Sequence, residues 1–272
     1  MRKRLSLALL SLVLTFTTVL AHAQAREEAR LLTAKQVIKE LGDTPDQFIP
    51  TDLLARAYGI VVVPNVTKAA FFFGAERGNG VLVVRNKYGH FSDPIFVNLT
   101  GGSFGFQWGV QSTDVVLVFT TQRSINKITS GKITLGADAS VAAGPIGRQA
   151  SAATDPTASS EIYSYSRSRG LFLGVALKGS VITIDNNADA RFYNRGSVDA
   201  VDIANGTVTS SDPIAGQFLA EIDRATGTPV PPSASEPQAS PPPTAAAPAP
   251  AAQGTQTFPL ADPQPGAEPE TH

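Results

Sequence analysis

The sequence contains no cysteine and only three histidines. Without cysteine the chain cannot form a disulfide framework, a thiolate zinc site, an iron–sulfur cluster or a cysteine nucleophile. The histidines are His22, His90 and His272, and the first and last lie in end segments that we argue are removed or unstructured. A Ser-His-Asp triad would depend on His90 alone, and a metal site almost entirely on carboxylates. We therefore expect a protein that is not an enzyme and carries no metal and no cofactor.

Charge is missing from residues 5–20, which follow the basic Arg-Lys-Arg at positions 2–4. This apolar stretch of 16 residues is shorter than the roughly 20 that a membrane-spanning helix needs. Residues 21–25 then read AHAQA, a small-x-small pattern typical of a cleavage site. The pattern predicts a signal peptide over residues 1–23, cleaved after Ala23 or Ala25, and a location in the periplasm or outside the cell. An uncleaved membrane anchor is the alternative.

Lysine and arginine are also absent from Thr228–His272, which holds 13 of the 20 prolines and four acidic residues. A segment of this composition buries too little apolar surface to offset the entropy of ordering it. We expect residues 228–272 to form a disordered, partly polyproline tail. Its role is either that of a solvated tail or that of a spacer that crosses a cell-wall layer or docks a partner.

The remaining segment, residues 26–227, carries 19 basic and 19 acidic residues and 21 of the 23 glycines. Its neutrality argues against nucleic acid as a partner, because neutralising phosphates requires a basic stripe. The glycines at 74, 78 and 80 match neither phosphate-binding glycine pattern, so nucleotide binding is not supported. About 200 residues suffice for one core that buries roughly 70% of the unfolded surface.

Hydrophobic spacing predicts helices at the start of this segment. Residues 26–41 place Leu31, Ala34, Ile38 and Leu41 on one face, which is typical of an amphipathic helix. A second short helix is expected over residues 51–58. The β-branched run 60–63 then predicts a buried strand that ends at Pro64.

The middle of the segment reads as strands separated by glycine. We expect a hairpin in which residues 74–80 form the turn between strands at 71–73 and 81–84. Residues 102–110 alternate cleanly, and the side chains expected on one face of that strand are Phe104, Phe106, Trp108 and Val110. The opposite face is made largely of glycine, which lets a ligand or another backbone approach closely.

Further strands and two helices complete the segment. Strands are expected at residues 115–119, 133–135, 162–166, 170–177 and 181–184, and helices at 122–130 and from Pro213 onward, the last with Asp212 as its N-cap. Hairpin-length turns outnumber helical crossovers, which favours antiparallel pairing. The expected fold is α+β, with a mainly antiparallel glycine-rich β-sheet, N-terminal amphipathic helices and a C-terminal helix.

Two arginines stand out as candidates for anion binding. Arg167 and Arg169 are two residues apart in an extended segment and so project to the same side, beside hydroxyls and aromatic rings. They either hold a phosphate or carboxylate group or pair with acidic residues on neighbouring strands. His90 follows a Tyr-Gly turn and is most simply a solvated loop residue; a hydrolase that uses it is the third and weakest interpretation.

Several sequence blocks resemble the SYLF domain family. They are the run LLARAYGIVVVP at 53–64, GGSFGFQWGVQ at 101–111, SGKITLGADASVAAGPIGR at 130–148 and IYSYSRSRGLFLGVALKG at 162–179. The resemblance covers residues 30–225 and is closest to the secreted bacterial branch. In eukaryotic members the resemblance implies binding of phosphoinositides or other anionic lipids, with an amphipathic N-terminal helix that contacts the membrane, and in some fungal members a link to actin. For the bacterial branch it implies generic lipid binding, and the phosphoinositide ligand does not carry over.

From these observations we predict a non-enzymatic envelope protein that binds anionic phospholipid head groups or membrane surfaces. The residues assigned to head groups are Arg30, Lys35, Lys39 and Lys68, with Arg167 and Arg169 as a second anionic site. Phe104, Phe106 and Trp108 line an apolar groove or belong to the core. The alternative is an envelope scaffold that binds a protein or a cell-wall polymer, with the proline-rich tail as spacer.

Overall fold

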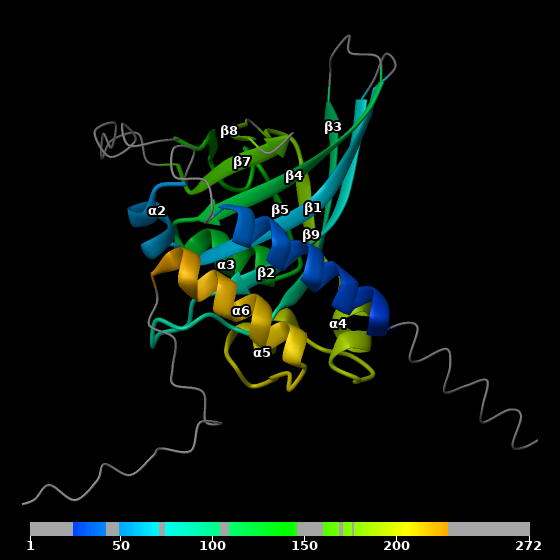
Figure 1. The fold of residues 1–272 in the computed structure, drawn as a ribbon, viewed down its shortest axis with the longest axis vertical. Coiled ribbons are helices and arrows are strands. Elements are labelled where there is room, and N and C mark those ends of the chain that lie inside the picture. The colour runs from blue at the N-terminus through cyan, green and yellow to red at the C-terminus, as the bar shows by residue number, and fades with distance from the viewer. Residues whose placement is uncertain are drawn as a thin grey trace, which may run out of the picture. The chain divides into compact units, whose positions relative to one another are not determined.

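A computed structural model of the chain shows one α+β unit within residues 24–227 (Figure 1). The structure describes residues 24–41, 49–70, 74–103, 109–145, 160–168, 171–175 and 177–227. The signal peptide and tail predicted for the two ends lie outside these residues.

In the part of the chain that the structure describes, nine strands form one sheet. They are β1 (Gly59–Ala70), β2 (Gly74–Val84), β3 (Ile95–Ser103), β4 (Gly109–Phe119), β5 (Lys132–Thr134), β6 (Val141–Ala143), β7 (Ile162–Ser168), β8 (Leu171–Gly174) and β9 (Val181–Ile184). The order is β5-β9-β3-β2-β1-β4-β7-β6, with β8 paired to β7. Only the β6–β7 pairing is parallel among these strands, so the expectation of a mainly antiparallel sheet is confirmed.

Helices pack against the sheet. They are the N-terminal helix over residues 24–41, α2 (Thr51–Ala55), α3 (Gln122–Thr129), α4 (Asn186–Phe192), α5 (Ala200–Ala204) and α6 (Pro213–Thr226). The N-terminal helix and α6 lie in front of the long strands in Figure 1. No helix among the described residues is long and apolar enough to cross a membrane.

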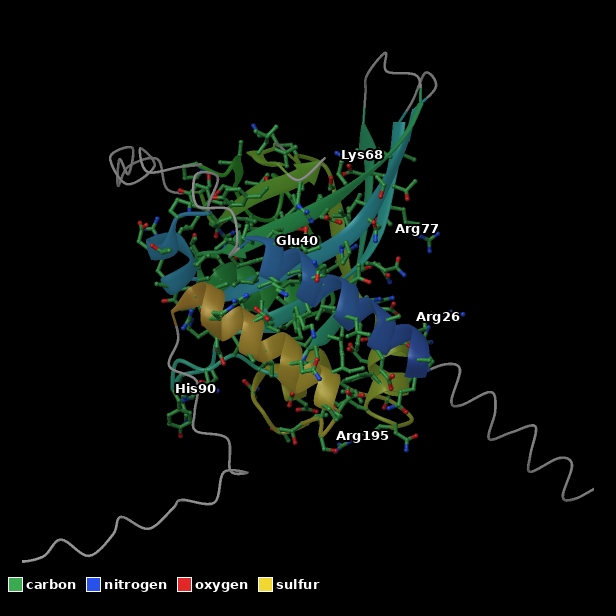
Figure 2. All side chains as sticks on the ribbon, in the orientation of Figure 1. Arg26, Glu40, Lys68, Arg77, His90 and Arg195 are labelled. Atoms are coloured by element: carbon green, nitrogen blue, oxygen red, sulfur yellow. The ribbon has the colours of Figure 1, made fainter. Side chains whose placement is uncertain are left out.

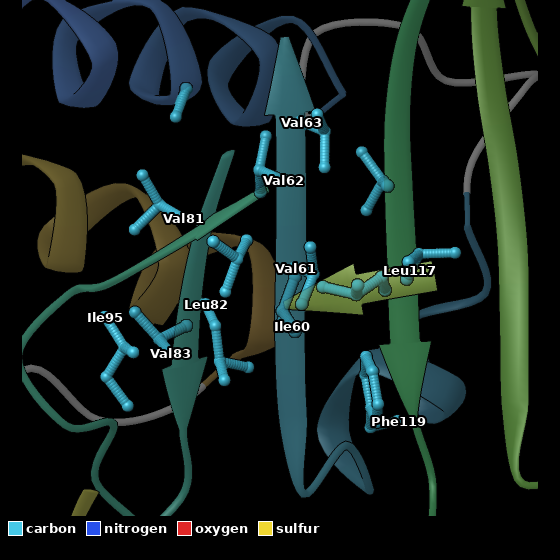
Figure 3. Close-up of a cluster of buried hydrophobic side chains, with 14 of the residues drawn as sticks. Ile60, Val61, Val62, Val63, Val81, Leu82, Val83, Ile95, Leu117 and Phe119 are labelled. Atoms are coloured by element: carbon cyan, nitrogen blue, oxygen red, sulfur yellow. The ribbon is translucent and has the colours of Figure 1, made fainter. Parts of the chain in front are cut away.

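The hydrophobic core lies between the sheet and the helices that pack against it, around the part of β1 to β4 that the helices cover (Figure 1). Successive side chains of β1 point to opposite faces, so Val62 meets Val81 on one face while Val61 meets Leu82 on the other (Figure 3). All four side chains are fully buried. Burial on both faces explains why residues 60–63 form a continuous β-branched run and do not alternate with polar residues.

The predictions for the first and last helices are confirmed. In the N-terminal helix Leu31, Ala34, Ile38 and Leu41 are buried. At the other end, the Asp212 side chain accepts a hydrogen bond from the backbone N–H of Ile214 at 2.7 Å, and Pro213 occupies the first turn of α6. The cap satisfies one of the free N–H groups at the helix start.

The prediction that the first strand stops at Pro64 is wrong. β1 continues to Ala70, and its pairing with β2 shifts register between Val62 and Thr67. The shift marks a bulge, in which Asn65 has a φ of 51°. A bulge leaves backbone groups out of the ladder, so a proline without an N–H is tolerated there.

The prediction that residues 74–80 form a turn is also wrong, because they are the first half of β2. Gly78 and Gly80 face the bulge of β1. A Cβ atom on Gly78 would lie 2.6 Å from Val63 Cγ1, and one on Gly80 would lie 2.5 Å from the Val62 carbonyl oxygen. These glycines therefore serve close packing between strands, not chain reversal. Residues 71–73, predicted as a strand, lie outside the described residues.

Candidate functional site

The four central strands extend beyond the helices that cover them. β1, β2, β3 and β4 have 12, 11, 9 and 11 residues, whereas the common strand length is about 5–6. The N-terminal helix crosses the lower part of the face that carries Phe96 and Val81. The upper part of the same face extends past the helix (Figure 1).

Cross-strand register identifies the side chains on this uncovered area. Thr67 faces both Arg77 and Ser112, Arg77 faces Thr100, and Asn79 faces Asn98. The rows continue across β9 and β5, because Thr183 faces Asn98 and Lys132. We call this area the polar shelf and define it by Thr67, Arg77, Asn79, Asn98, Thr100, Ser112, Lys132, Thr134, Val181 and Thr183.

The polar shelf is a solvated surface of hydroxyl and amide groups with two cations. Arg77 and Lys132 are exposed, and neither forms an ion pair with any described residue. They are three strand spacings apart, on the order of 15 Å. Arg77 projects outward from the long strands (Figure 2). Guanidinium and ammonium groups both suit phosphate or carboxylate oxygens.

Two of the predicted head-group residues border the polar shelf but are engaged in ion pairs. Arg30 lies 3.3 Å from Asp185 and 5.2 Å from the centre of the Phe96 ring, and its side chain is only 8% exposed. Arg167 pairs with Asp114 at 3.4 Å and with Glu40 of the N-terminal helix. Pairing of Arg167 with acidic residues was one of the two alternatives that the sequence left open. These pairs also neutralise the carboxylates at the two edges of the polar shelf.

The other described candidates lie elsewhere. Lys35 donates to Gln217 Oε1 of α6 at 2.8 Å, and Lys39 is exposed on the same helix. Lys68 lies on the sheet face opposite Thr67 and pairs with the buried Glu76 at 3.3 Å. The structure therefore distributes the predicted head-group residues over several surfaces and does not assemble them into one cluster.

Four candidates lie outside the described residues: Arg169, Phe104, Phe106 and Trp108. The flanking strand ends are described. Gly74 pairs with Ala70 and with Ser103, and Ala70 pairs with Gly109. These four strand ends therefore lie at the same end of the sheet.

Sequence reasoning missed Arg77 and Lys132 as candidates. Arg77 was assigned to a turn, and Lys132 preceded a short predicted strand. The signal that identifies Arg77 is the alternation of Ala75, Arg77 and Asn79 with Glu76, Gly78 and Gly80, which is a strand period once the glycines are taken as strand residues.

The described residues hold no group of acidic, histidine or cysteine side chains that could bind a metal ion. The backbone N–H of His90 donates to Asn86 Oδ1 at 3.1 Å within the turn after β2. His90 also lies close enough to the half-buried Asp223 to lower the pKa of that carboxyl, although burial has the larger effect and raises it. No hydrogen bond from a serine or threonine hydroxyl to the His90 ring occurs among the described residues.

The mostly antiparallel sheet with helices packed against it defines an α+β domain, and the polar shelf is an open part of one sheet face within the described residues. Residues 100–225 match the family model described as "Ysc84: Las17-binding protein actin regulator". The chain therefore contains a SYLF domain of the Ysc84 family, which confirms the resemblance noted in the sequence.

Relatives come from yeast and vertebrates. The chain is 40% identical over 151 residues to "LAS seventeen-binding protein 3" of Saccharomyces cerevisiae, which covers 54% of this chain and 33% of the relative. It is 30% identical over 187 residues to "SH3 domain-containing YSC84-like protein 1" of Xenopus laevis, covering 68% of this chain and 55% of the relative. The chain is 31% identical over 172 residues to the human protein of that name, and the match covers 63% of this chain and 50% of the human protein. The chain thus spans between a third and about half of these relatives.

Proposed function

We propose that this chain is a non-enzymatic module that binds anionic phospholipid surfaces through the polar shelf. The observation that carries the proposal is a pair of exposed cations, Arg77 and Lys132, that form no ion pair with the described residues and lie on a sheet face otherwise made mostly of hydroxyl and amide groups. Three acidic residues that border this face, Asp114, Asp138 and Asp185, are in ion pairs, so they repel an anionic surface little. The family resemblance, which implies lipid binding, supports the same function.

The shape of the site suits a surface more than a soluble ligand. A small molecule is usually enclosed in a concave pocket, whereas the polar shelf is an open sheet face. Residues 24–272 have a net charge of −4, so attraction to anionic lipid must arise from local cations. We place the processed chain in the periplasm or outside the cell, as a peripheral membrane protein.

Co-sedimentation with vesicles tests this function. The purified processed chain is mixed with phosphatidylcholine vesicles, with or without phosphatidylglycerol. We expect binding only to the anionic vesicles and a decrease with salt. The double variant Arg77→Glu/Lys132→Glu should bind at least roughly thirtyfold more weakly, because each cation near an anionic surface contributes about 1 kcal/mol.

The matched control is Arg56→Glu/Arg195→Glu. It makes the same change in net charge at two exposed positions outside the polar shelf, and Arg195 lies below Arg77, near the bottom of the folded part in Figure 2. Equal loss of binding in both double variants would show that net charge alone governs the interaction. No sedimentation with anionic vesicles at low salt would remove the proposed function.

The second candidate is an envelope scaffold that binds a protein or a cell-wall polymer. It is favoured by the names of the yeast relatives, which are described as binding Las17. This alternative assigns the tail, residues 228–272, a spacer role. Deleting the tail should then release the protein from its site in the envelope, whereas membrane binding through the polar shelf predicts unchanged co-sedimentation of the truncated chain.

A further inference from the structure

An open pocket of about 570 Å³ lies where the turn after β2 meets α3 and α5. Among the described residues, five large hydrophobic side chains are exposed, and three of these line this pocket: Tyr58, Tyr88 and Val201. Single exposed hydrophobic residues are ordinary, but their concentration around one hollow points to a binding site.

Tyr88 is held in place by the backbone around it, although its ring is in solvent. The residue is 74% exposed. The Asn86 side-chain oxygen accepts a hydrogen bond from the backbone N–H of Tyr88 at 2.9 Å, and Arg85 donates to the Gly89 carbonyl at 3.0 Å. The backbone that carries the ring is therefore held in place, which lowers the entropy cost of ordering the turn when a ligand binds against it.

The rest of the lining is rich in carboxamides. Asn86, Gln122, Asn126 and Asn205 are among the residues that line the pocket. Gln122 Nε2 donates to Asn126 Oδ1 at 3.0 Å, which fixes their orientation and leaves the Asn126 amide hydrogens free to donate. The Asn86 oxygen already accepts from the backbone N–H groups of Tyr88 and His90. The other three carboxamides offer donors and acceptors side by side, the pattern that neighbouring hydroxyl groups of a ligand require.

The charged residues in the lining are Arg85 and Lys87, both cations. Arg85 is already committed, since it also donates to the carbonyls of Ala57 and Leu54 at 2.9 and 3.3 Å. The Lys87 ammonium lies 5.0 Å from the centre of the Tyr88 ring. It forms no ion pair with a described residue and can pair with an acidic substituent on a ligand that packs against that ring.

We propose that this pocket binds a segment of an oligosaccharide. Sugar rings present apolar C–H faces that pack on exposed aromatic rings, and hydroxyl edges that pair with carboxamides. A polyproline peptide would also pack on tyrosine rings, but its backbone needs only donors, so the acceptor oxygens of Gln122, Asn126 and Asn205 favour the saccharide. The pocket lies on the side of α3 and α5, apart from the polar shelf, and its ligand is independent of membrane binding.

The test is a titration of the processed chain, followed by NMR of the side-chain amide signals. The probes are chitotetraose, cellotetraose and tetragalacturonate. We expect at least one of them to shift the signals of Gln122, Asn126 and Asn205. Tyr88→Ala should raise the dissociation constant about fivefold to tenfold, and Gln122→Ala should weaken binding with both tyrosine rings retained. Leu173→Ala removes an exposed hydrophobic side chain on β8 and is the control, with no expected effect.

Three results would overturn the proposal. One is that none of the saccharides shifts the pocket signals at millimolar concentration. Another is an equal loss of affinity in Tyr88→Ala and Leu173→Ala. The third is that decaproline shifts the pocket signals while no saccharide does, which would assign the pocket to a polyproline peptide.

Discussion

Adding one methyl group at Gly80 tests whether β2 packs against the bulge of β1 as described. The new Cβ atom would lie 2.5 Å from the Val62 carbonyl oxygen, 2.7 Å from Val63 Cγ2 and 3.0 Å from Val63 Cα. Two of these three atoms belong to the backbone and cannot rotate away. Gly80→Ala therefore requires the two strands to separate or the bulge to change.

The magnitude follows from two opposing effects. Overpacking a well-packed core costs about 1–3 kcal/mol, and contact with backbone places this change at the upper end. Removing a glycine from the unfolded chain returns about 0.4–1 kcal/mol. We expect a net loss of about 2 kcal/mol in the free energy of unfolding, or about 4–8 °C in Tm for a domain of this size.

Gly216 provides the matched control. It lies within α6, and a Cβ atom there meets no atom within 4 Å. Gly216→Ala should stabilise the protein by about 0.5–1 kcal/mol, because alanine has the higher helix propensity. Urea unfolding followed by circular dichroism measures both variants. A Gly80→Ala protein within about 0.5 kcal/mol of the parent would refute the described packing.

Two further predictions concern the buried charges under the N-terminal helix. Arg191→Ala should lower the free energy of unfolding, measured in urea, by about 3–5 kcal/mol, because it leaves the fully buried carboxylate of Glu27, 2.6 Å away, without its partner. A loss below about 1 kcal/mol would contradict the ion pair. Burial raises the pKa of Asp189 to about 7. Between about pH 4 and pH 7 the folded state therefore keeps a proton that the unfolded state has lost. The free energy of unfolding should fall by up to about 4 kcal/mol as pH rises through this window. Asp189→Asn should flatten that part of the pH profile, and an unchanged slope would contradict it.

Short-range sequence signals were sufficient to predict several helices and turns. α6 follows from Asp212, Pro213 and the apolar spacing after them, since capping and periodicity are properties of neighbouring residues. The turn at residues 86–89 follows from Asn86 and from Gly89, whose φ is 88°. The helices α4 and α5 were missed, because they have only 7 and 5 residues and show little periodicity at that length.

Contacts between segments that are distant in the sequence could not be predicted from neighbouring residues alone. Gly78 and Gly80 looked like turn residues, since glycine serves both turns and close strand packing, and only the position of the β1 bulge distinguishes the two roles. The same holds for the candidate site. Arg167 was identified as a notable cation, but whether it faces a ligand or Asp114 depends on the register of β4 and β7.

The absence of cysteine allows the membrane contact to be measured directly. A single cysteine introduced at the exposed Thr100 of the polar shelf carries an environment-sensitive fluorophore, and a second protein carries it at Arg195. Upon addition of phosphatidylglycerol vesicles, the account predicts a blue shift and brighter emission from position 100 and no change at position 195. An unchanged signal at position 100, or an equal response at both positions, would contradict binding through the polar shelf.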